Sequence, residues 1–150
     1  SHVLIGIIQG YGLDPGYFQF EITENVATEY SESFCTAIDD FAEVGIHMCL
    51  DDFGSGYAGL SLLTRFQPDK IKIDREIVSD IHLSGPKQAI VRSIVSCCSD
   101  LEITLVAEGI EKIEEWCWLE SAGIRRFQGF LFARPQLNGV GDIHWPHLVR

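Results

Sequence analysis

The sequence has few basic residues, no long apolar run and no regular spacing of its cysteines. Lys and Arg total 11 against 22 Asp and Glu, for a net charge of −11, so binding of DNA or RNA through its phosphate backbone is not expected. No apolar run approaches the ~20 residues of a membrane span, so we expect no membrane segment, and no signal peptide is visible. The five cysteines form an odd set without metal-ligand spacing, which favours reduced thiols in a cytoplasmic protein over disulfides.

What is present suits one soluble globular domain, because 46% of the 150 residues are hydrophobic and such a chain can bury a core. Hydrophobic periodicity predicts five strands, within residues 17–23, 46–52, 70–74, 103–108 and 124–132. It also predicts helices at residues 31–44, 58–66, 76–83, 86–98 and 111–122. Alternation of strands and helices indicates an α/β fold with a parallel sheet or barrel. In such a fold both faces of each strand are expected to be buried.

Two adjacent carboxylates, Asp51 and Asp52, stand at the end of the second predicted strand, just before a loop with three glycines. Carboxylates this close repel each other unless a metal ion, another cation or a shared proton offsets the charge. Neighbours on a strand point to opposite faces, but at a strand end both can still reach one cation. The glycines let the backbone approach a ligand closely. Taken alone, the motif is also compatible with a solvated acidic turn.

A polar residue recurs in or at the end of each predicted strand: Glu21, Asp51, Lys72, Glu108 and Gln128. Any one of them could be an ordinary partner in a buried salt bridge. In a barrel, however, they would converge at the face where enzymes of this architecture build their sites. Five such residues in register favour a shared functional site.

The ordered motifs resemble the EAL domain, the bacterial cyclic-di-GMP phosphodiesterase family. The matching elements appear in family order at residues 21–24, 51–57, 72–74, 107–111 and 128–130, followed by Pro135. Residues 59–63 also resemble EAL domains fused to blue-light-sensing BLUF domains. The resemblance implies a TIM-barrel-like (β/α) EAL fold, present here as an incomplete barrel of about five βα units. It also implies a signalling reaction that opens cyclic-di-GMP to linear pGpG.

The resemblance further implies a role for each matching residue. The ligands of a two-metal site for Mg²⁺ or Mn²⁺ would be Glu21, Asp51, Asp52 and Glu108. Lys72 would act in catalysis together with Glu108 and Asp52. Glu111 and Gln128 would position the substrate or support the site. Glu24 would fix the loop after the Asp pair. Oxygen ligands suit these ions. Two ions ~3.5–4 Å apart would activate a water and neutralise the diester.

The Glu-x-Leu motif of the family's first strand, and an Asn from another early strand, are not in this sequence. A complete barrel needs ~200–250 residues, so we expect residues 1–150 to be the C-terminal part of an EAL domain, inactive alone because ligands are missing. The alternative is a degenerate, non-catalytic module that binds cyclic-di-GMP or a regulatory protein. Its exposed strand edges would then be covered by a homodimer or by that partner. A metal-binding scaffold unrelated to nucleotides is the third possibility.

Overall fold

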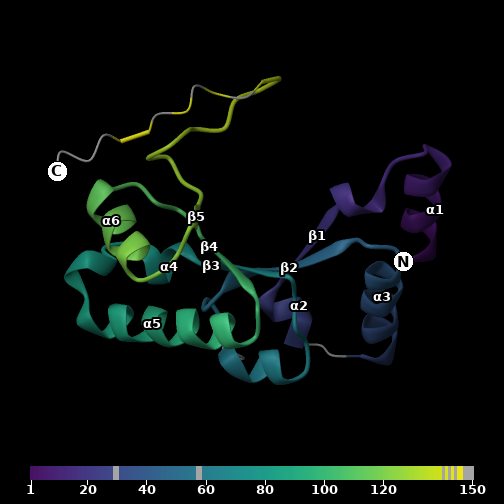
Figure 1. The fold of residues 1–150 in the computed structure, drawn as a ribbon, viewed down its shortest axis with the longest axis horizontal. Coiled ribbons are helices and arrows are strands. Elements are labelled where there is room, and N and C mark those ends of the chain that lie inside the picture. Colours follow the sequence, from purple (N-terminus) through teal and green to yellow (C-terminus); the bar gives the residue numbers. More distant parts are fainter. Residues whose placement is uncertain (29–30, 57–58, 140, 142, 144, 147–150) are drawn as a thin grey trace.

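A computed structural model describes residues 1–28, 31–56, 59–139, 141, 143 and 145–146. Its centre is a sheet of five parallel strands in chain order (Figure 1): β1 (Gln19–Thr23), β2 (His47–Phe53), β3 (Lys70–Ile73), β4 (Thr104–Ala107) and β5 (Arg126–Phe127). Neighbouring parallel strands require a crossover connection, and helical segments supply it here. The predicted α/β fold with a parallel sheet is confirmed.

Helices precede the sheet and connect its strands: α1 (His2–Gly10), η1 (Pro15–Tyr17), α2 (Glu24–Thr28), α3 (Glu32–Glu43), η2 (Gly59–Thr64), α4 (Arg75–Val78), η3 (Ile81–Leu83), α5 (Gly85–Asp100) and α6 (Ile113–Ser121). Figure 1 shows α2, α3 and α5 on the same side of the sheet. Helices predicted at residues 31–44, 86–98 and 111–122 are confirmed within a few residues. The segment predicted as one helix at residues 76–83 is divided into α4 and η3, and residue 58 lies outside the described residues.

The side of the sheet that faces the helices is apolar. Strand residues alternate between the two faces, so β3 buries Ile71 and Ile73 in this core while Lys70 and Lys72 lie on the other face. The core is completed by fully buried side chains from β2, α5 and α6, among them Leu50, Val91, Cys98 and Leu119.

The other face of the sheet is only partly buried, so the expectation that both faces would be buried is wrong for most of the strands, although both faces are buried at Cys49 and Leu50 in the middle of β2. In β3, for example, fully buried and half-buried residues alternate along the strand. The physical reason is that the sheet does not close. Within the described residues the strand order runs from β1 to β5, and each of these two strands pairs on one side only.

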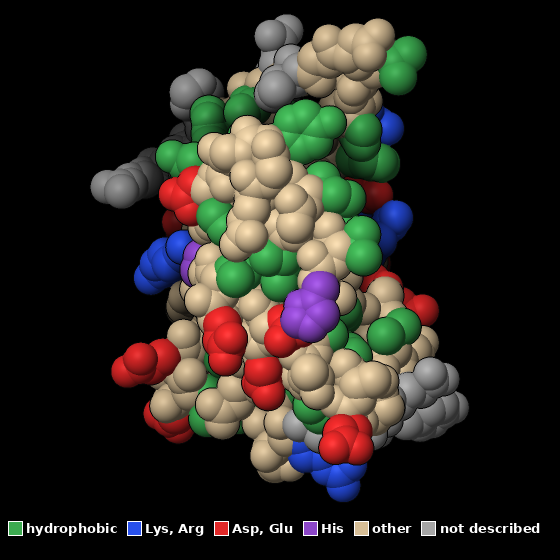
Figure 2. Space-filling view, turned by 90° about the vertical axis from the view of Figure 1, so that its right-hand side faces the viewer, with side chains coloured by type: hydrophobic (Ala, Val, Ile, Leu, Met, Phe, Trp, Pro, Cys, Tyr) green, Lys and Arg blue, Asp and Glu red, His purple; other side chains and the backbone are tan. Residues whose placement is uncertain are grey.

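A smaller core lies beside β1, where the rings of Phe20 and Phe41 stack with centroids 4.4 Å apart. On its outer side α1 leaves apolar residues exposed, including Val3, Ile7 and Tyr11. Figure 2 views the molecule from the side where α1 and α3 lie and shows hydrophobic side chains spread over the upper part of this face. Among the described residues, no helix combines the length and the apolar character needed to cross a bilayer.

Strand β5 is shorter than predicted, because residues 124–132 were expected to be one strand and only Arg126 and Phe127 pair with β4. The chain turns after Gln128. A Cβ atom on Gly129 would lie 2.2 Å from the carbonyl oxygen of Ile110. The Ile110 N–H donates to the Gln128 carbonyl at 3.2 Å, and the Leu131 N–H donates to the Ile110 carbonyl at 3.0 Å. This close backbone approach, which only glycine permits, ends the strand.

Candidate metal centre

Strand β2 ends in a bulge. Leu50 pairs with Ile71 and Phe53 pairs with Ile73, so two residues of β2 stand opposite the single residue between Ile71 and Ile73. Such a bulge re-aims side chains at the end of a strand. Asp52 has a left-handed backbone with φ 55°, a conformation that Asp adopts more readily than most residues.

The bulge explains how two adjacent aspartates serve one site. Leu50 and Phe53 both remain in the core, at 0% and 2% exposed, although a regular strand would place residues three apart on opposite faces. The carboxylates of Asp51 and Asp52 lie in one group with that of Glu108, with ligand oxygens within 4.8 Å of one another. Glu108 follows β4, where its N–H donates to the Ile73 carbonyl at 3.2 Å.

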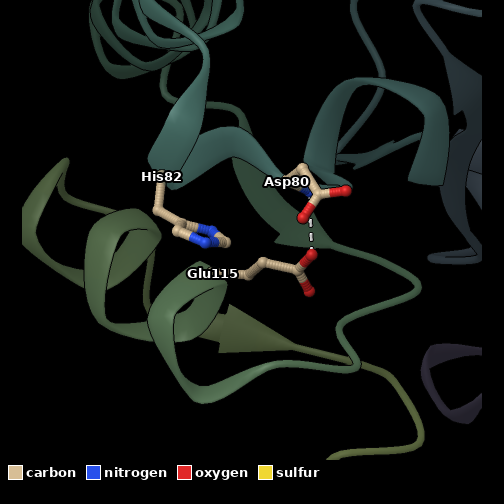
Figure 3. A group of neighbouring side chains, drawn as sticks. All are labelled: Asp80, His82 and Glu115. Carbon is tan, nitrogen blue, oxygen red and sulfur yellow. Dashed lines mark hydrogen bonds between the residues drawn. The ribbon is translucent and has the colours of Figure 1, made fainter.

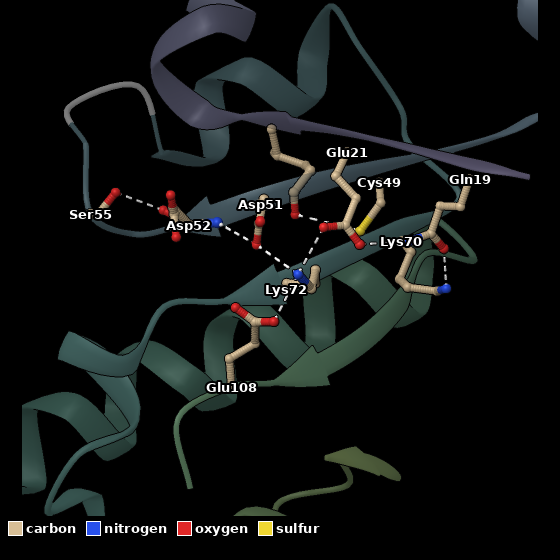
Figure 4. Close-up of polar contacts among 10 residues, drawn as sticks. Gln19, Glu21, Cys49, Asp51, Asp52, Ser55, Lys70, Lys72 and Glu108 are labelled. Carbon is tan, nitrogen blue, oxygen red and sulfur yellow. Dashed lines mark hydrogen bonds and ion pairs between the residues drawn. The ribbon is translucent and has the colours of Figure 1, made fainter. Parts of the chain in front are cut away.

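The ammonium of Lys72 lies among three carboxylates (Figure 4). Its Nζ is 2.8 Å from Glu108 Oε1, 3.1 Å from Asp51 Oδ1 and 3.1 Å from Glu21 Oε2. Burial lowers the pKa of Lys72, but the hydrogen bonds to Glu108, Glu21 and Asp51 outweigh burial and hold the pKa above its ordinary value. Lys72 is therefore charged at neutral pH, and Glu21 joins the group through this shared ammonium.

Two carboxyl groups of the cluster, those of Asp52 and Glu108, have raised pKa values. Burial raises the pKa of Asp52, and the neighbouring Asp51 and Asp74 raise it further. Burial also raises the pKa of Glu108, although its hydrogen bond to Lys72 acts in the opposite direction. Clustered carboxylates favour an added cation because it offsets their repulsion. The oxygen-only donor set of Asp51, Asp52 and Glu108 fits a hard divalent ion such as Mg²⁺ or Mn²⁺.

Glu24 lies beneath the loop that follows Asp52. Its side chain is almost fully buried, and its Oε2 accepts hydrogen bonds from the N–H groups of Gly54 at 2.9 Å and Gly56 at 3.4 Å. A Cβ atom on Gly56 would lie 2.9 Å from Glu24 Oε1. These are the contacts that the predicted loop-fixing role requires, and that role stays a prediction. Tyr57 of the same motif lies outside the described residues.

A cavity of about 630 Å³ adjoins the carboxylates and includes Asp52 and Glu108 in its lining. The two predicted positioning residues, Glu111 and Gln128, also line it. Glu111 Oε1 forms an ion pair with Arg75 Nη2 at 2.8 Å. The volume lies within the range of about 300–1,000 Å³ that is typical of small-molecule sites.

Among the lining residues to which the sequence analysis gave no role of their own are Arg75, Phe130 and Arg134. The side chain of Arg75 is packed so closely against Gly109 that a Cβ atom there would lie 2.6 Å from it. Arg134 and Phe130 follow the last strand. The sequence did offer one signal for Arg134: it is a basic residue just beyond the final motif in a chain with a net charge of −11.

A second group of possible ligands, Asp80, His82 and Glu115, lies between η3 and α6 (Figure 3). Glu115 is buried, and its carboxylate accepts hydrogen bonds from the N–H groups of Asp80 at 2.8 Å and of Glu111 and Lys112 at 3.1 Å each. Lys112 in turn forms an ion pair with Asp80. Backbone N–H groups therefore satisfy the Glu115 carboxylate, Lys112 offsets the charge of Asp80, and the group braces the segment that carries Glu111.

Comparisons with known proteins agree with this geometry. The sequence profile described as "EAL domain" matches residues 2–135. The chain belongs to the EAL domain family. This confirms the resemblance predicted from the motifs, and it explains why the five strands and their polar residues occur in this order.

Individual EAL relatives are similar over most of this chain. The blue light- and temperature-regulated antirepressor BluF of Escherichia coli K12 is 47% identical over 143 residues, which cover 95% of this chain and 36% of BluF. The cyclic di-GMP phosphodiesterase PdeR of the same organism is 43% identical over 115 residues, covering 77% of this chain and 17% of PdeR. The similarity to BluF agrees with the predicted likeness to blue-light-linked EAL domains.

Among solved structures, Klebsiella pneumoniae BlrP1 in a manganese and cyclic-di-GMP complex matches with a TM-score of 0.91 and 55% identity. The match covers 96% of this chain and 37% of the BlrP1 chain. The chain thus spans well under half the length of each of these three relatives.

Proposed function

We propose that this chain supplies the carboxylate cluster of a metal-dependent domain that hydrolyses cyclic-di-GMP to linear pGpG. The observation that carries the proposal is the group of Asp51, Asp52 and Glu108 around Lys72, beside a cavity of about 630 Å³. The name of PdeR as a cyclic di-GMP phosphodiesterase and the manganese and cyclic-di-GMP complex of BlrP1 support the same reaction.

In this proposal the divalent ions, Mg²⁺ or Mn²⁺, would be held by Asp51, Asp52 and Glu108. Glu21, on the other side of the Lys72 ammonium, would be a further ligand. A bound divalent ion supplies a water of lowered pKa and neutralises the charge of the phosphodiester. Lys72 remains protonated and orients the attacking water or a phosphate oxygen through its N–H donors. The water oxygen bonds to phosphorus and gives up a proton, one ring P–O bond breaks, and the leaving sugar oxygen takes up a proton to become a hydroxyl.

We further infer that residues 1–150 are the C-terminal part of an EAL domain and that this part alone turns over little or no substrate. The Glu-x-Leu motif is absent from the sequence, and losing oxygen ligands weakens the hold on a divalent ion. The unpaired sides of β1 and β5 in the described chain are consistent with a barrel that needs further strands.

The test is calorimetry of cyclic-di-GMP binding to this chain, first with Mg²⁺ and then with Ca²⁺, for wild type and Asp51→Asn. We expect a metal-dependent heat that Asp51→Asn abolishes, with circular dichroism showing that both proteins are folded. Chromatography of the mixtures measures pGpG. A folded wild-type chain without any heat would contradict nucleotide binding, and rapid pGpG formation that Asp51→Asn removes would contradict the inferred inactivity.

A second candidate function is a non-catalytic module that binds a protein, either a second copy or a regulatory partner. The observation in its favour is the exposed apolar side of α1, where Val3 and Tyr11 are 78% and 80% exposed, together with the name of BluF as an antirepressor. Sedimentation of the wild type and of Val3→Glu tests the homodimer. A concentration-dependent dimer that the substitution disrupts would support it, and a monomer at all concentrations would exclude it.

A further inference from the structure

One part of the cavity wall is formed by an arginine above an aromatic ring. The guanidinium carbon of Arg134 lies 4.6 Å from the centroid of the Phe130 ring. Phe130 is 47% exposed, and both residues line the same cavity as Asp52 and Glu108. An arginine over an aromatic face is held by cation–π attraction, so the orientation of this guanidinium is partly fixed before any ligand binds.

Arg134 differs from Arg75, the other arginine of the cavity. The guanidinium of Arg75 is neutralised by Glu111 at 2.8 Å. Within the described residues, Arg134 contacts the ring of Phe130 and forms no ion pair with a carboxylate. Its five N–H donors therefore remain available to a ligand in the cavity.

The chemistry of this pair suits a guanine base. A guanidinium presents two parallel N–H donors, and the O6 and N7 atoms of guanine are two adjacent acceptors that match them. Adenine offers N7 but carries an amino donor in place of O6, so it satisfies one of the two donors and opposes the other. An exposed aromatic ring adds a stacking surface for a base. In the proposed function, the phosphate of the same ligand is bound through Lys72 and the divalent ions that the carboxylate cluster would hold.

We propose that Arg134, held over Phe130, is a specificity-determining residue that reads the O6 and N7 acceptors of one guanine of a cyclic dinucleotide. The proposal rests on the proposed function, because it takes this cavity as the nucleotide site. A bidentate contact of this kind discriminates against the wrong base by about 1–3 kcal/mol, or about 5- to 150-fold in affinity.

The experiment measures by calorimetry, with Ca²⁺ present, the affinity of this chain for three ligands: cyclic-di-GMP, its inosine analogue and cyclic-di-AMP. The inosine analogue keeps O6 and N7 but lacks the 2-amino group, so it isolates the contact proposed here. The variants are Arg134→Met, which removes the donors, Arg134→Lys, which keeps the charge without the fork, and Phe130→Leu. Arg92→Met is the matched control, because Arg92 also lies over an aromatic ring, that of Trp118, but does not line the cavity.

We expect the wild type and Arg92→Met to prefer the guanine and inosine ligands over cyclic-di-AMP. Arg134→Met should lose this preference by weakening the first two ligands about 5- to 150-fold while leaving cyclic-di-AMP unchanged. Arg134→Lys, whose ammonium can still donate to O6 and N7, and Phe130→Leu should each show a smaller loss of the same kind. Equal weakening of all three ligands would assign Arg134 to a phosphate and overturn the proposal, as would full discrimination in Arg134→Met. If the folded wild type binds none of the three, the proposed function fails before the variants are compared.

Discussion

Glu24 and Gly54 are joined by a hydrogen bond of 2.9 Å from the glycine N–H to the Glu24 carboxylate. Glu24 begins α2 directly after β1, whereas Gly54 follows the bulge of β2. A buried carboxylate from one βα connection thus fixes the loop of the next, immediately beside Asp52. The position of the candidate metal ligands therefore depends on a residue that is not itself one of the predicted ligands.

The first prediction concerns this anchor. Glu24→Ala should lower the free energy of unfolding by about 1–3 kcal/mol, because it leaves backbone N–H groups without an acceptor in a buried place. Glu24→Gln should cost less, since its amide oxygen still accepts from Gly54. Urea unfolding measures both values. Equal stability of Glu24→Ala and wild type would show that the loop does not need this carboxylate.

The second prediction concerns Lys72, whose removal leaves three carboxylates without their shared ammonium. Without divalent ions, Lys72→Met should lower the free energy of unfolding by about 2–4 kcal/mol, as expected for a largely buried ion-pair network that loses one partner. Mn²⁺ should restore more stability to Lys72→Met than it adds to wild type, because a ligand of the folded state stabilises it by mass action. Thermal unfolding with and without Mn²⁺ measures this difference.

Lys70→Met is the control, because Lys70 lies on the same strand and face but contacts the amide of Gln19. It should lose less stability and gain no extra response to Mn²⁺. The two variants should also differ in their dependence on pH. Because the pKa of Lys72 is raised in the folded chain, the stability it confers is complete below the ordinary lysine pKa of 10.5 and is lost as pH rises toward the raised value. Lys72→Met should lack this loss of stability at alkaline pH. If its stability falls at alkaline pH as much as that of the wild type, the loss does not come from Lys72.

The third prediction separates the two properties of Asp52, its backbone and its charge. Asp52→Asn and Asp52→Gly should both keep the left-handed conformation at little cost, because Asn and Gly tolerate φ > 0. Asp52→Val should lower the free energy of unfolding by about 1–3 kcal/mol, since a β-branched residue is strained there. All three should weaken Mn²⁺ binding. If Asp52→Val is as stable as the wild type, residue 52 does not need the left-handed backbone that the bulge imposes.

The sequence predicted those parts of the fold and site that depend on local periodicity. Alternation in residues 70–74 predicts that Lys72 lies on the opposite face of its strand from Ile71 and Ile73. The same kind of pattern predicted that Glu21 and Glu108 lie in, or at the ends of, other strands of the sheet. The bulge could not be predicted, because it is defined by the pairing of Leu50 and Phe53 with another strand. The strand predicted at residues 124–132 was too long because its end is set by a tertiary contact of Gly129.

The residues that sequence reasoning missed owe their roles to contacts distant along the chain. Glu115 reads as one more polar residue of a helix, yet it is buried where it accepts the N–H of Asp80. Arg134 lies in an irregular segment without periodicity, so only the cavity shows that it faces the same space as Glu108.

The last prediction uses the five cysteines, all of which are free, as reporters of the packed sheet. Burial raises the pKa of Cys49 and of Cys98 to about 12, whereas Cys35, Cys97 and Cys117 are half-buried. Because the thiolate is the reactive form, a thiol with a pKa of about 12 is ionised to only about one part in 10⁴ at pH 8. A disulfide reagent at pH 8 should therefore label three thiols quickly and two slowly, and all five quickly in urea.

Two variants assign the labelled sites. Cys97→Ala should remove one fast-reacting thiol, and Cys98→Ala, its neighbour in α5, should leave the fast count unchanged. Cys49 lies in β2 on the same face as Lys72, so its rate reports on the open side of the sheet. If Cys49 is labelled quickly while Cys98 stays protected, the sheet face that carries the carboxylate cluster opens although the core under α5 stays packed. This result would contradict a preformed cluster. Slow labelling of both would support a sheet that holds its carboxylates in place before any ion binds.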